Sequence, residues 1–170
     1  GAEKPNPKGD VYHAIQHCAG VLHDNESTRD DKAFYLRLLV HFVGDLHQPL
    51  HVGRLEDRGG DDIKVRWFGR NSNLHRVWDS EMINGYQMSY TELANNLPKY
   101  TAEKQQTIVS TSVLDRMHES QRHAKQIYLS VAKDESLGYA YQREYFSLVR
   151  HRLHKGGLRL AKLLNDIFDN

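Results

Sequence analysis

Apolar side chains recur at steps of three and four residues along several stretches of the chain. Near the amino terminus these positions are Val11, Ala14, Ile15, Cys18, Val21 and Leu22. This spacing predicts a helix over about residues 10–24. A second helix is expected from near Arg29 to just before Pro49, because proline disfavours helix in the residue before it. From Leu36 to Val43 the second segment is apolar on most faces, which predicts a central, buried helix.

The carboxyl-terminal half continues the helical pattern. Short helices are expected over residues 74–83 and 89–96, and long ones over 113–131 and 144–168. Gly156-Gly157 lies inside the last of these, where glycine weakens a helix and indicates close packing or a break. Residues 63–68 alternate apolar and polar positions like a strand, and 69–73 have the composition of a turn. The pattern predicts a single domain over 1–170, mainly α, with one small β-hairpin or strand near 62–69.

Composition narrows the class of protein. The chain has 170 residues, enough for one sizeable core, and no apolar run long enough for a transmembrane helix. The opening segment 1–9 has no apolar signal core. Lys and Arg number 23 against 22 Asp and Glu, so the chain does not bind nucleic acid through net charge alone. The single cysteine, Cys18, excludes an internal disulfide and multi-cysteine zinc modules and is expected to be a small buried hydrophobe.

Histidine is the unusual residue, with eleven copies, and imidazole is the commonest metal ligand. Two segments concentrate histidine and aspartate, HFVGDLHQPLH (41–51) and NLHRVWD (73–79). His41 and Asp45 are four residues apart, which places them on one face of a helix, and His75 and Asp79 repeat that spacing. A zinc site needs three or four imidazole or carboxylate ligands. His51 joined to His75 and Asp79 would form one site, and His41 with Asp45 would begin another.

Pairs with this spacing also arise by chance in a chain with eleven histidines. The spacing alone therefore does not distinguish metal ligands from ordinary hydrogen-bonded histidines of the core. The position of three of these residues along the chain favours a metal site over that alternative. His41, Asp45 and His51 lie on or beside the most apolar predicted helix. A buried histidine or aspartate there must be paired or metal-bound to offset its desolvation.

The two segments, with Gly59-Gly60 between them, closely resemble the zinc-dependent single-strand-specific nucleases of the S1/P1 type, which are related in fold to zinc-dependent phospholipase C. The resemblance includes neighbours that are not ligands and extends into the closing helices, so it covers nearly all of the chain. These neighbours are Gly44, Gln48-Pro49-Leu50, Asn73-Leu74, Trp78, Glu119-Ser120, residues 157–165 and Ile167-Phe168.

The resemblance implies a three-zinc enzyme. His51, His75 and Asp79 would be the complete protein ligand set of one zinc ion. His41 and Asp45 would bind the other two, with Asp45 as the bridging carboxylate and the catalytic residue. In such enzymes a water between the paired metals attacks phosphorus, and the third metal bears charge on the phosphate and leaving oxygen. The implied substrates are single-stranded DNA and RNA, cleaved toward 5′-nucleotides, with 3′-nucleotidase activity. Family members are exported, which implies a secreted or periplasmic protein with no membrane attachment.

The chain also departs from the family. The family's amino-terminal Trp, whose α-amino group and carbonyl bind zinc, and a following His, Asp and His have no counterpart before the helix that starts near Asp10. The resemblance therefore predicts one complete zinc site here, and an isolated chain far less active than its parent. Asp61-Asp62 stand where the family often has Asn after the glycine pair, and a carboxylate near the cleft would repel phosphate.

Two other functions remain open. The first is a phospholipase C or phosphomonoesterase on the same metal frame, which would differ in the groups that hold the non-phosphate part of the substrate. The second is a non-catalytic helical domain with one structural zinc. A closed set of four protein ligands would favour the structural role, whereas three ligands and a water are typical of an open, catalytic site.

Several further side chains have two interpretations. His13 and His17 form a pair four residues apart, and an exposed helix face is favoured over a stray metal site. His47 lies between two expected ligands but points away from the His41/Asp45 face, so we expect it behind the ligands or at the surface. A set of arginines near the metal segments could contact phosphates or form a solvated hairpin face: Arg54, Arg58, Arg66, Arg70 and Arg76. Surface positions are expected for His118, His123, His151 and His154.

Overall fold

A computed structural model describes residues 9–169 of the chain. The opening segment without a signal core lies outside the described residues, apart from Gly9. The helices are α1 (Val11–His23), α2 (Arg29–His47), the 3-10 helix η1 (Pro49–Val52), α3 (Leu74–Arg76), the π-helical turn η2 (Val77–Glu81), α4 (Met82–Gly85), α5 (Tyr90–Asn95), α6 (Ala102–Val109), α7 (Val113–Leu129) and α8 (Tyr139–Phe168). The strands are β1 (Lys64–Trp67), β2 (Arg70–Asn73) and β3 (Ser136–Leu137). The fold is mainly α, as the pattern predicts.

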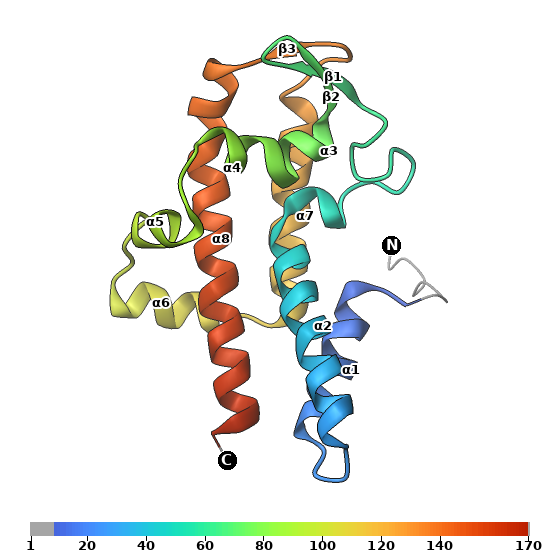
Figure 1. The fold of residues 1–170 in the computed structure, drawn as a ribbon, viewed down its shortest axis with the longest axis vertical. Helices are drawn as coiled ribbons and strands as arrows, with labels where there is room; N and C mark the ends of the chain where they lie inside the picture. The colour runs from blue at the N-terminus through green and yellow to red at the C-terminus, as the bar shows by residue number, and fades with distance from the viewer. Residues whose placement is uncertain (1–8, 170) are drawn as a thin grey trace.

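Three helices, α2, α7 and α8, run along the long axis of the molecule, and α1 packs beside α2 (Figure 1). The small sheet covers one end, and α5 and α6 lie on the outer side of α8. One apolar core lies under the sheet and includes Trp67, Trp78 and Ile127. A second lies between α1 and α2 and includes Leu22 and Leu39. None of the helices within residues 9–169 has the length and apolar composition that crossing a bilayer requires.

The β region is larger than its sequence pattern suggests. β1 pairs antiparallel with β2, with Trp67 opposite Arg70, so the prediction that 69–73 is only a turn was wrong. Positive φ angles at Phe68 and Gly69 close the hairpin, as a tight two-residue turn requires. β3 adds a short parallel strand beside β1. It pairs through backbone groups. A segment of two residues is too short to show the alternation of side chains that predicts a strand.

Two helical predictions also need correction. α6 was not predicted, and α8 begins at Tyr139 rather than Glu144. Gly156-Gly157 does not interrupt α8. A Cβ atom at Gly156 would lie 3.3 Å from the imidazole ring of His47 on α2, so the first glycine permits close packing of the two helices. Of the two interpretations of this glycine pair, close packing is confirmed and a break in the helix is wrong.

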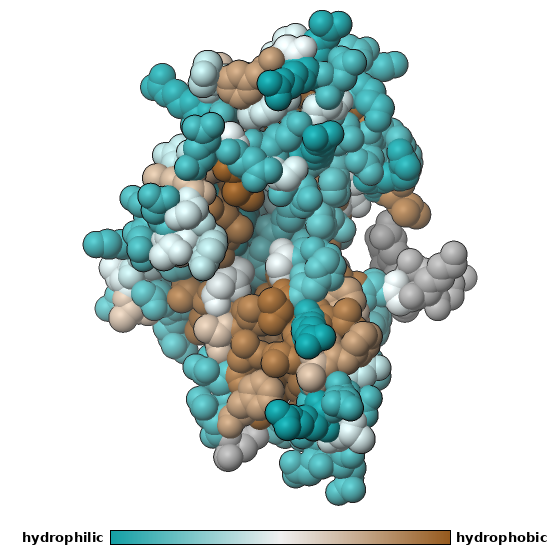
Figure 2. All heavy atoms as spheres, in the orientation of Figure 1, coloured by the Kyte–Doolittle hydropathy of each residue, from teal (hydrophilic) through white to brown (hydrophobic). Residues whose placement is uncertain are grey.

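The prediction of a central, buried α2 is correct for its position, since α2 packs against α1, α7 and α8, and wrong for its burial. Leu39, Val43 and Leu46 form its buried side, but Phe34 and Val40 are 55% and 44% exposed. Figure 2 shows hydrophobic side chains gathered on this face of the molecule, over the lower parts of α2 and α8. A run of apolar residues does not reveal how many of its sides other helices cover, and here α2 keeps one side open.

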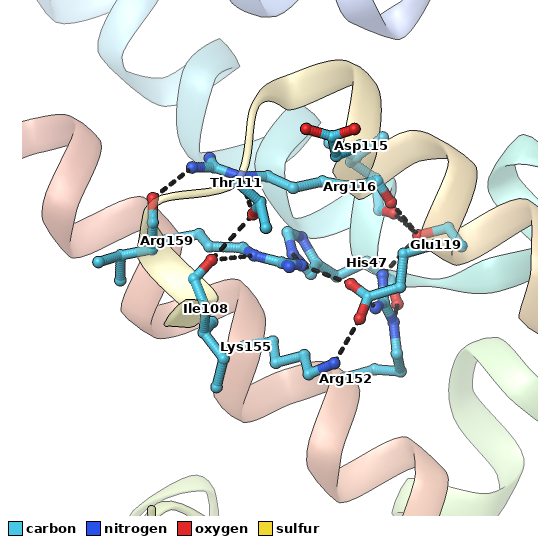
Figure 3. A network of polar contacts seen from close by, with 12 residues as sticks. His47, Ile108, Thr111, Asp115, Arg116, Glu119, Arg152, Lys155 and Arg159 are labelled. Atoms are coloured by element: carbon cyan, nitrogen blue, oxygen red, sulfur yellow. Dashed lines mark hydrogen bonds and ion pairs between the residues drawn. The ribbon is translucent and has the colours of Figure 1, made fainter. Parts of the chain in front are cut away.

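A buried ionic cluster joins α7 and α8 to the carboxyl-terminal end of α2 (Figure 3). Glu119 of α7 accepts hydrogen bonds from three cations of α8: Arg152 and Arg159, at 2.7 Å each, and Lys155. Arg152 and Arg159 are 3% and 2% exposed. Charges at this depth require partners, because an unpaired buried charge strongly destabilises a fold.

His47 completes this cluster and is buried, which excludes a surface position. Its Nδ1 lies 2.7 Å from the carbonyl oxygen of Val43, so Nδ1 carries the proton and Nε2 can accept the 3.0 Å hydrogen bond from Arg159. Burial and the nearby positive charge of Arg152 lower the pKa of His47 to about 3. The ring is therefore neutral, and its contacts face α8, away from the His41/Asp45 side of α2.

Candidate metal centre

Three predicted ligands meet in space. His51 of η1, His75 of α3 and Asp79 of η2 each offer one ligand atom, and these atoms lie within 4.8 Å of one another. Within residues 9–169 no other group of three histidine, cysteine or carboxylate side chains is so arranged. The rings of His51 and His75 are stacked, with centroids 5.0 Å apart. Two imidazoles and one carboxylate suit zinc, and three protein ligands leave a coordination position open.

The local backbone orients His75 and Asp79. The Asn73 side chain caps α3 by accepting a 2.7 Å hydrogen bond from the backbone N–H of Arg76. The helix then widens into the π-helical turn η2, which carries Asp79. Such π-helical turns are frequent at functional sites. The spacing of four between His75 and Asp79 therefore spans a widened turn rather than an ordinary helical one.

Gly59 holds His75 in the orientation that a metal ligand needs. His75 Nδ1 lies 3.0 Å from the Gly59 carbonyl oxygen, and a proton on Nδ1 leaves Nε2 free to bind metal. Gly59 has a φ of +65°, and a Cβ there would lie 2.4 Å from the Leu50 carbonyl oxygen. Only glycine fits this close approach, so Gly59, from the glycine pair between the two histidine-rich segments, directly contacts one of the candidate ligands.

Asp45 lies between the two predicted sites. Its Oδ2 is 3.1 Å from His41 Nε2, and its Oδ1 is 3.2 Å from His51 Nδ1. His51 Nε2 in turn lies 3.1 Å from Asp79 Oδ1. The His41 side chain is 64% exposed, so the argument that its burial demands a metal was wrong, because α2 keeps this side open. The pairing of His41 and Asp45 on one face, by contrast, is what their spacing predicts.

A groove of about 870 Å³ runs past the cluster and is lined by α1, the end of α2, η1 and the loop after it. Arg54 and Arg58 lie in its wall, whereas Arg66 and Arg70 lie on the exposed hairpin. Arg58 forms a 2.7 Å ion pair with Asp62. Of the two carboxylates expected to repel phosphate, Asp62 is therefore paired with a cation.

The loop that forms this wall is anchored on α7. The Tyr128 hydroxyl donates a 3.0 Å hydrogen bond to Asp57 and accepts one of 3.0 Å from the Arg54 backbone N–H. The Arg54 guanidinium also lies 4.2 Å from the centre of the Tyr128 ring. Burial raises the pKa of Tyr128 to about 12, which keeps its hydroxyl protonated and able to donate. The arginine in the groove wall is thus held by a side chain far away in sequence.

Six further histidines, on α1, α7 and α8, lie outside the candidate cluster. His13 and His17 line the groove, and His13 contacts the capping residue Asp10 at 2.9 Å. Both histidines are exposed on α1, which agrees with the helix-face interpretation. His118 is exposed, but the expected surface positions of His123, His151 and His154 were wrong, since each is partly buried. His151 accepts or donates a 2.7 Å hydrogen bond with Tyr100, from the segment before the unpredicted α6.

The comparison of this chain with known protein families agrees with this geometry. The family model described as S1/P1 Nuclease matches residues 1–169. The chain belongs to the S1/P1 nuclease family. It is 35% identical to Endonuclease 4 of Arabidopsis thaliana over 79% of this chain and 50% of the relative. It is 30% identical to Nuclease S1 of Aspergillus oryzae, over 89% of this chain and 60% of that protein. It is also 30% identical to Nuclease P1 of Penicillium citrinum, over 91% and 65%. The chain thus spans about half the length of its Arabidopsis relatives.

The sequence pattern of this S1/P1 family member did not predict the ionic cluster behind the candidate metal centre. One signal could have found it. Arg152, Lys155 and Arg159 recur at steps of three and four along a helix that is otherwise apolar on that side, so they share one face. Three cations on a buried face require an acidic partner from another element. The identity of that partner, Glu119, depends on how α7 and α8 pack.

His75→Ala tests the ligand assignment. We expect it to remove the zinc ion from the purified chain, because only His51 and Asp79 of the cluster remain, and two protein ligands hold zinc poorly. Elemental analysis gives the zinc content per chain. The control is His118→Ala, an exposed histidine of α7, which should keep the wild-type content. Unchanged zinc in His75→Ala would contradict the assignment.

Proposed function

We propose that this chain is the larger, metal-binding part of a zinc-dependent phosphodiesterase that hydrolyses single-stranded DNA and RNA toward 5′-nucleotides and acts as a 3′-nucleotidase. The observation that carries the proposal is the meeting of His51, His75 and Asp79 within 4.8 Å of one another, with His51 and His75 on the wall of a groove that also contains Arg54 and Arg58. Membership of the S1/P1 nuclease family supports it.

In this proposal His51, His75 and Asp79 hold one zinc ion, and Asp45 with His41 contributes to a neighbouring pair. A zinc ion bound by these residues would supply Lewis acidity toward water and the phosphate. The chain itself orients the ligands: Gly59 fixes the His75 ring, and Asp45 contacts His41 and His51 with its two oxygens. Arg54, anchored on Tyr128, offers a cation to a phosphate in the groove.

A purely structural zinc is disfavoured, because the cluster has three protein ligands and borders an open groove, whereas structural sites are closed by four. The related phospholipase C activity has one observation in its favour. Leu55 lines the groove and is 90% exposed, and an exposed apolar rim suits a lipid tail. A nucleobase also packs on apolar surface, so the exposure of Leu55 does not separate the two activities, and assays with both substrates are needed.

A substrate panel tests the proposal. The chain is joined to the family's amino-terminal segment, or mixed with it as a separate fragment, and offered single-stranded DNA, a 3′-nucleotide and phosphatidylcholine with zinc present. We expect cleavage of the first two, with 5′-nucleotides among the products of the DNA, and no release of phosphocholine. His75→Ala is the control and should be inactive throughout. Hydrolysis of phosphatidylcholine without cleavage of DNA would favour the phospholipase alternative and contradict the proposal.

The family resemblance further implies that the parent protein acts outside the cytoplasm, in the secreted or periplasmic space. That location forms part of the proposal.

A further inference from the structure

The end of α2 is held by side chains from two distant helices. A helix leaves its last four carbonyl groups without partners inside the helix. In this chain the Leu46 carbonyl oxygen accepts a 2.5 Å hydrogen bond from Ser120 Oγ of α7. The His47 carbonyl oxygen accepts one of 3.0 Å from Arg152 Nε of α8. Both of these carbonyls are therefore satisfied from outside α2.

The Arg152 guanidinium is fixed in three directions at once. Its Nε points to α2, its Nη1 donates to Glu119 at 2.7 Å and its Nη2 donates to Ser120 Oγ at 2.5 Å. Its side chain is 3% exposed. A planar guanidinium can make this set of bonds with one rigid group, whereas the single ammonium of lysine cannot reproduce its geometry. Arg152, which belongs to α8, thus connects the end of α2 to both α7 and α8.

This end of α2 is also the base of the metal centre. Asp45 precedes the held carbonyl of His47 by two residues, and His51 follows it by four. Arg152 lines a pocket of about 230 Å³ together with Asp45, His51 and Asp79. A shift of the His47 carbonyl would move Asp45 and His51 together, because the chain from one to the other is continuous.

We propose that Arg152 is a positioning residue of the metal centre: it holds the end of α2 so that Asp45 and His51 keep the geometry that metal binding requires. It acts through the backbone carbonyl of His47. The inference rests on the metal site of the proposed function and adds a residue outside the ligand set to it.

Lys155 separates this role from general stabilisation. It lies on the same helix, one turn further along, and its ammonium donates to the same carboxylate of Glu119. The hydrogen bonds of its side chain do not extend to α2 among the described residues. Loss of Lys155 therefore weakens the ionic cluster and leaves the His47 carbonyl bonded to Arg152.

The experiment compares Co²⁺ binding by the wild-type chain, Arg152→Met and Lys155→Met, with unfolding by urea measured in parallel. Co²⁺ replaces Zn²⁺ as the probe because its visible absorption reports ligand geometry. We expect Arg152→Met to bind Co²⁺ about tenfold or more weakly, the usual loss when a group that orients a ligand is removed, and to change the absorption band. Lys155→Met should bind within about twofold of wild type with the same band, although both variants lose stability.

Ser120→Ala covers the case in which Arg152→Met does not fold. It removes the hydroxyl that accepts from Arg152 Nη2 and donates to the Leu46 carbonyl, and it leaves every charge in place, so we expect a severalfold loss of Co²⁺ affinity in a folded chain. Equal Co²⁺ affinity and band in Arg152→Met and Lys155→Met would overturn the positioning role, as would an unchanged Ser120→Ala if the arginine variant is unfolded. A wild-type chain that binds no Co²⁺ would overturn the metal site itself, and the positioning role with it.

Discussion

Replacing Glu119 by glutamine is expected to lower the free energy of unfolding by about 3–5 kcal/mol, the usual cost of removing one partner from a buried ionic group. Glu119 is the acidic partner of Arg152, Lys155 and Arg159, and its side chain is 17% exposed. The amide keeps the size of the side chain and removes its charge. Three cations would then face one another without compensation. Urea unfolding of wild type and variant at pH 7 measures the loss.

The control is Asp166→Asn. Asp166 pairs with Lys162 on the surface of the same α8 helix and is 54% exposed, so its loss should cost less than about 1 kcal/mol. A loss for Glu119→Gln no larger than that of Asp166→Asn would show that the cluster contributes little to stability.

The effect of Glu119→Gln should also depend on pH. Burial raises the pKa of Glu119, but hydrogen bonds from Lys155 and Arg159 and the charge of Arg152 outweigh burial and hold this pKa well below its ordinary value of 4.5. A carboxyl group with a depressed pKa stabilises the fold fully above its unfolded pKa and loses this contribution as the pH falls toward its folded pKa. The difference between wild type and variant should therefore be complete at pH 7 and shrink below about pH 4.5.

Asp45→Asn is expected to lower activity severely. In the enzyme restored with the family's amino-terminal segment, it should lower kcat by more than about 10²–10³-fold, the range seen when a group that stabilises transition-state charge is lost. A carboxylate can join two cations through its two oxygens, whereas an amide has one carbonyl oxygen and no charge. In this chain the two Asp45 oxygens already contact different histidines, His41 and His51.

The rate of DNA cleavage under saturating substrate gives kcat. Asp30→Asn is the matched control, since Asp30 lies in the first turn of the same helix, away from the site, and is exposed. It should cleave at the wild-type rate. The isolated chain should be far slower than the restored enzyme, because it offers only Asp45 and His41 to the metal pair. An isolated chain that cleaves at the restored rate, with zinc only at His51, His75 and Asp79, would refute the three-metal proposal.

Much of the fold follows from local pattern. The periodicity of apolar residues located α1, α2 and α7 closely, because helical contacts join residues three and four apart and depend on nearby sequence alone. The ligand candidates could be found for the same reason: His41 with Asp45, and His75 with Asp79, have the spacing of one helical turn. His51 was nominated as the partner of His75 and Asp79 because a zinc site needs a third ligand, and the resemblance of segments 41–51 and 73–79 to a nuclease family implies the same set.

Local sequence thus located most of the helices and one strand of the small sheet and nominated the candidate ligands, since each of these depends on neighbours in the chain. Tertiary structure decided the rest. It opened one side of α2 and exposed His41, added β3 to the sheet, and made Gly59 the acceptor for His75. It also brought Glu119 and Arg152 to the end of α2. These outcomes depend on which distant segments meet and in what register, and periodicity along one element carries no information about the surface that packs against it.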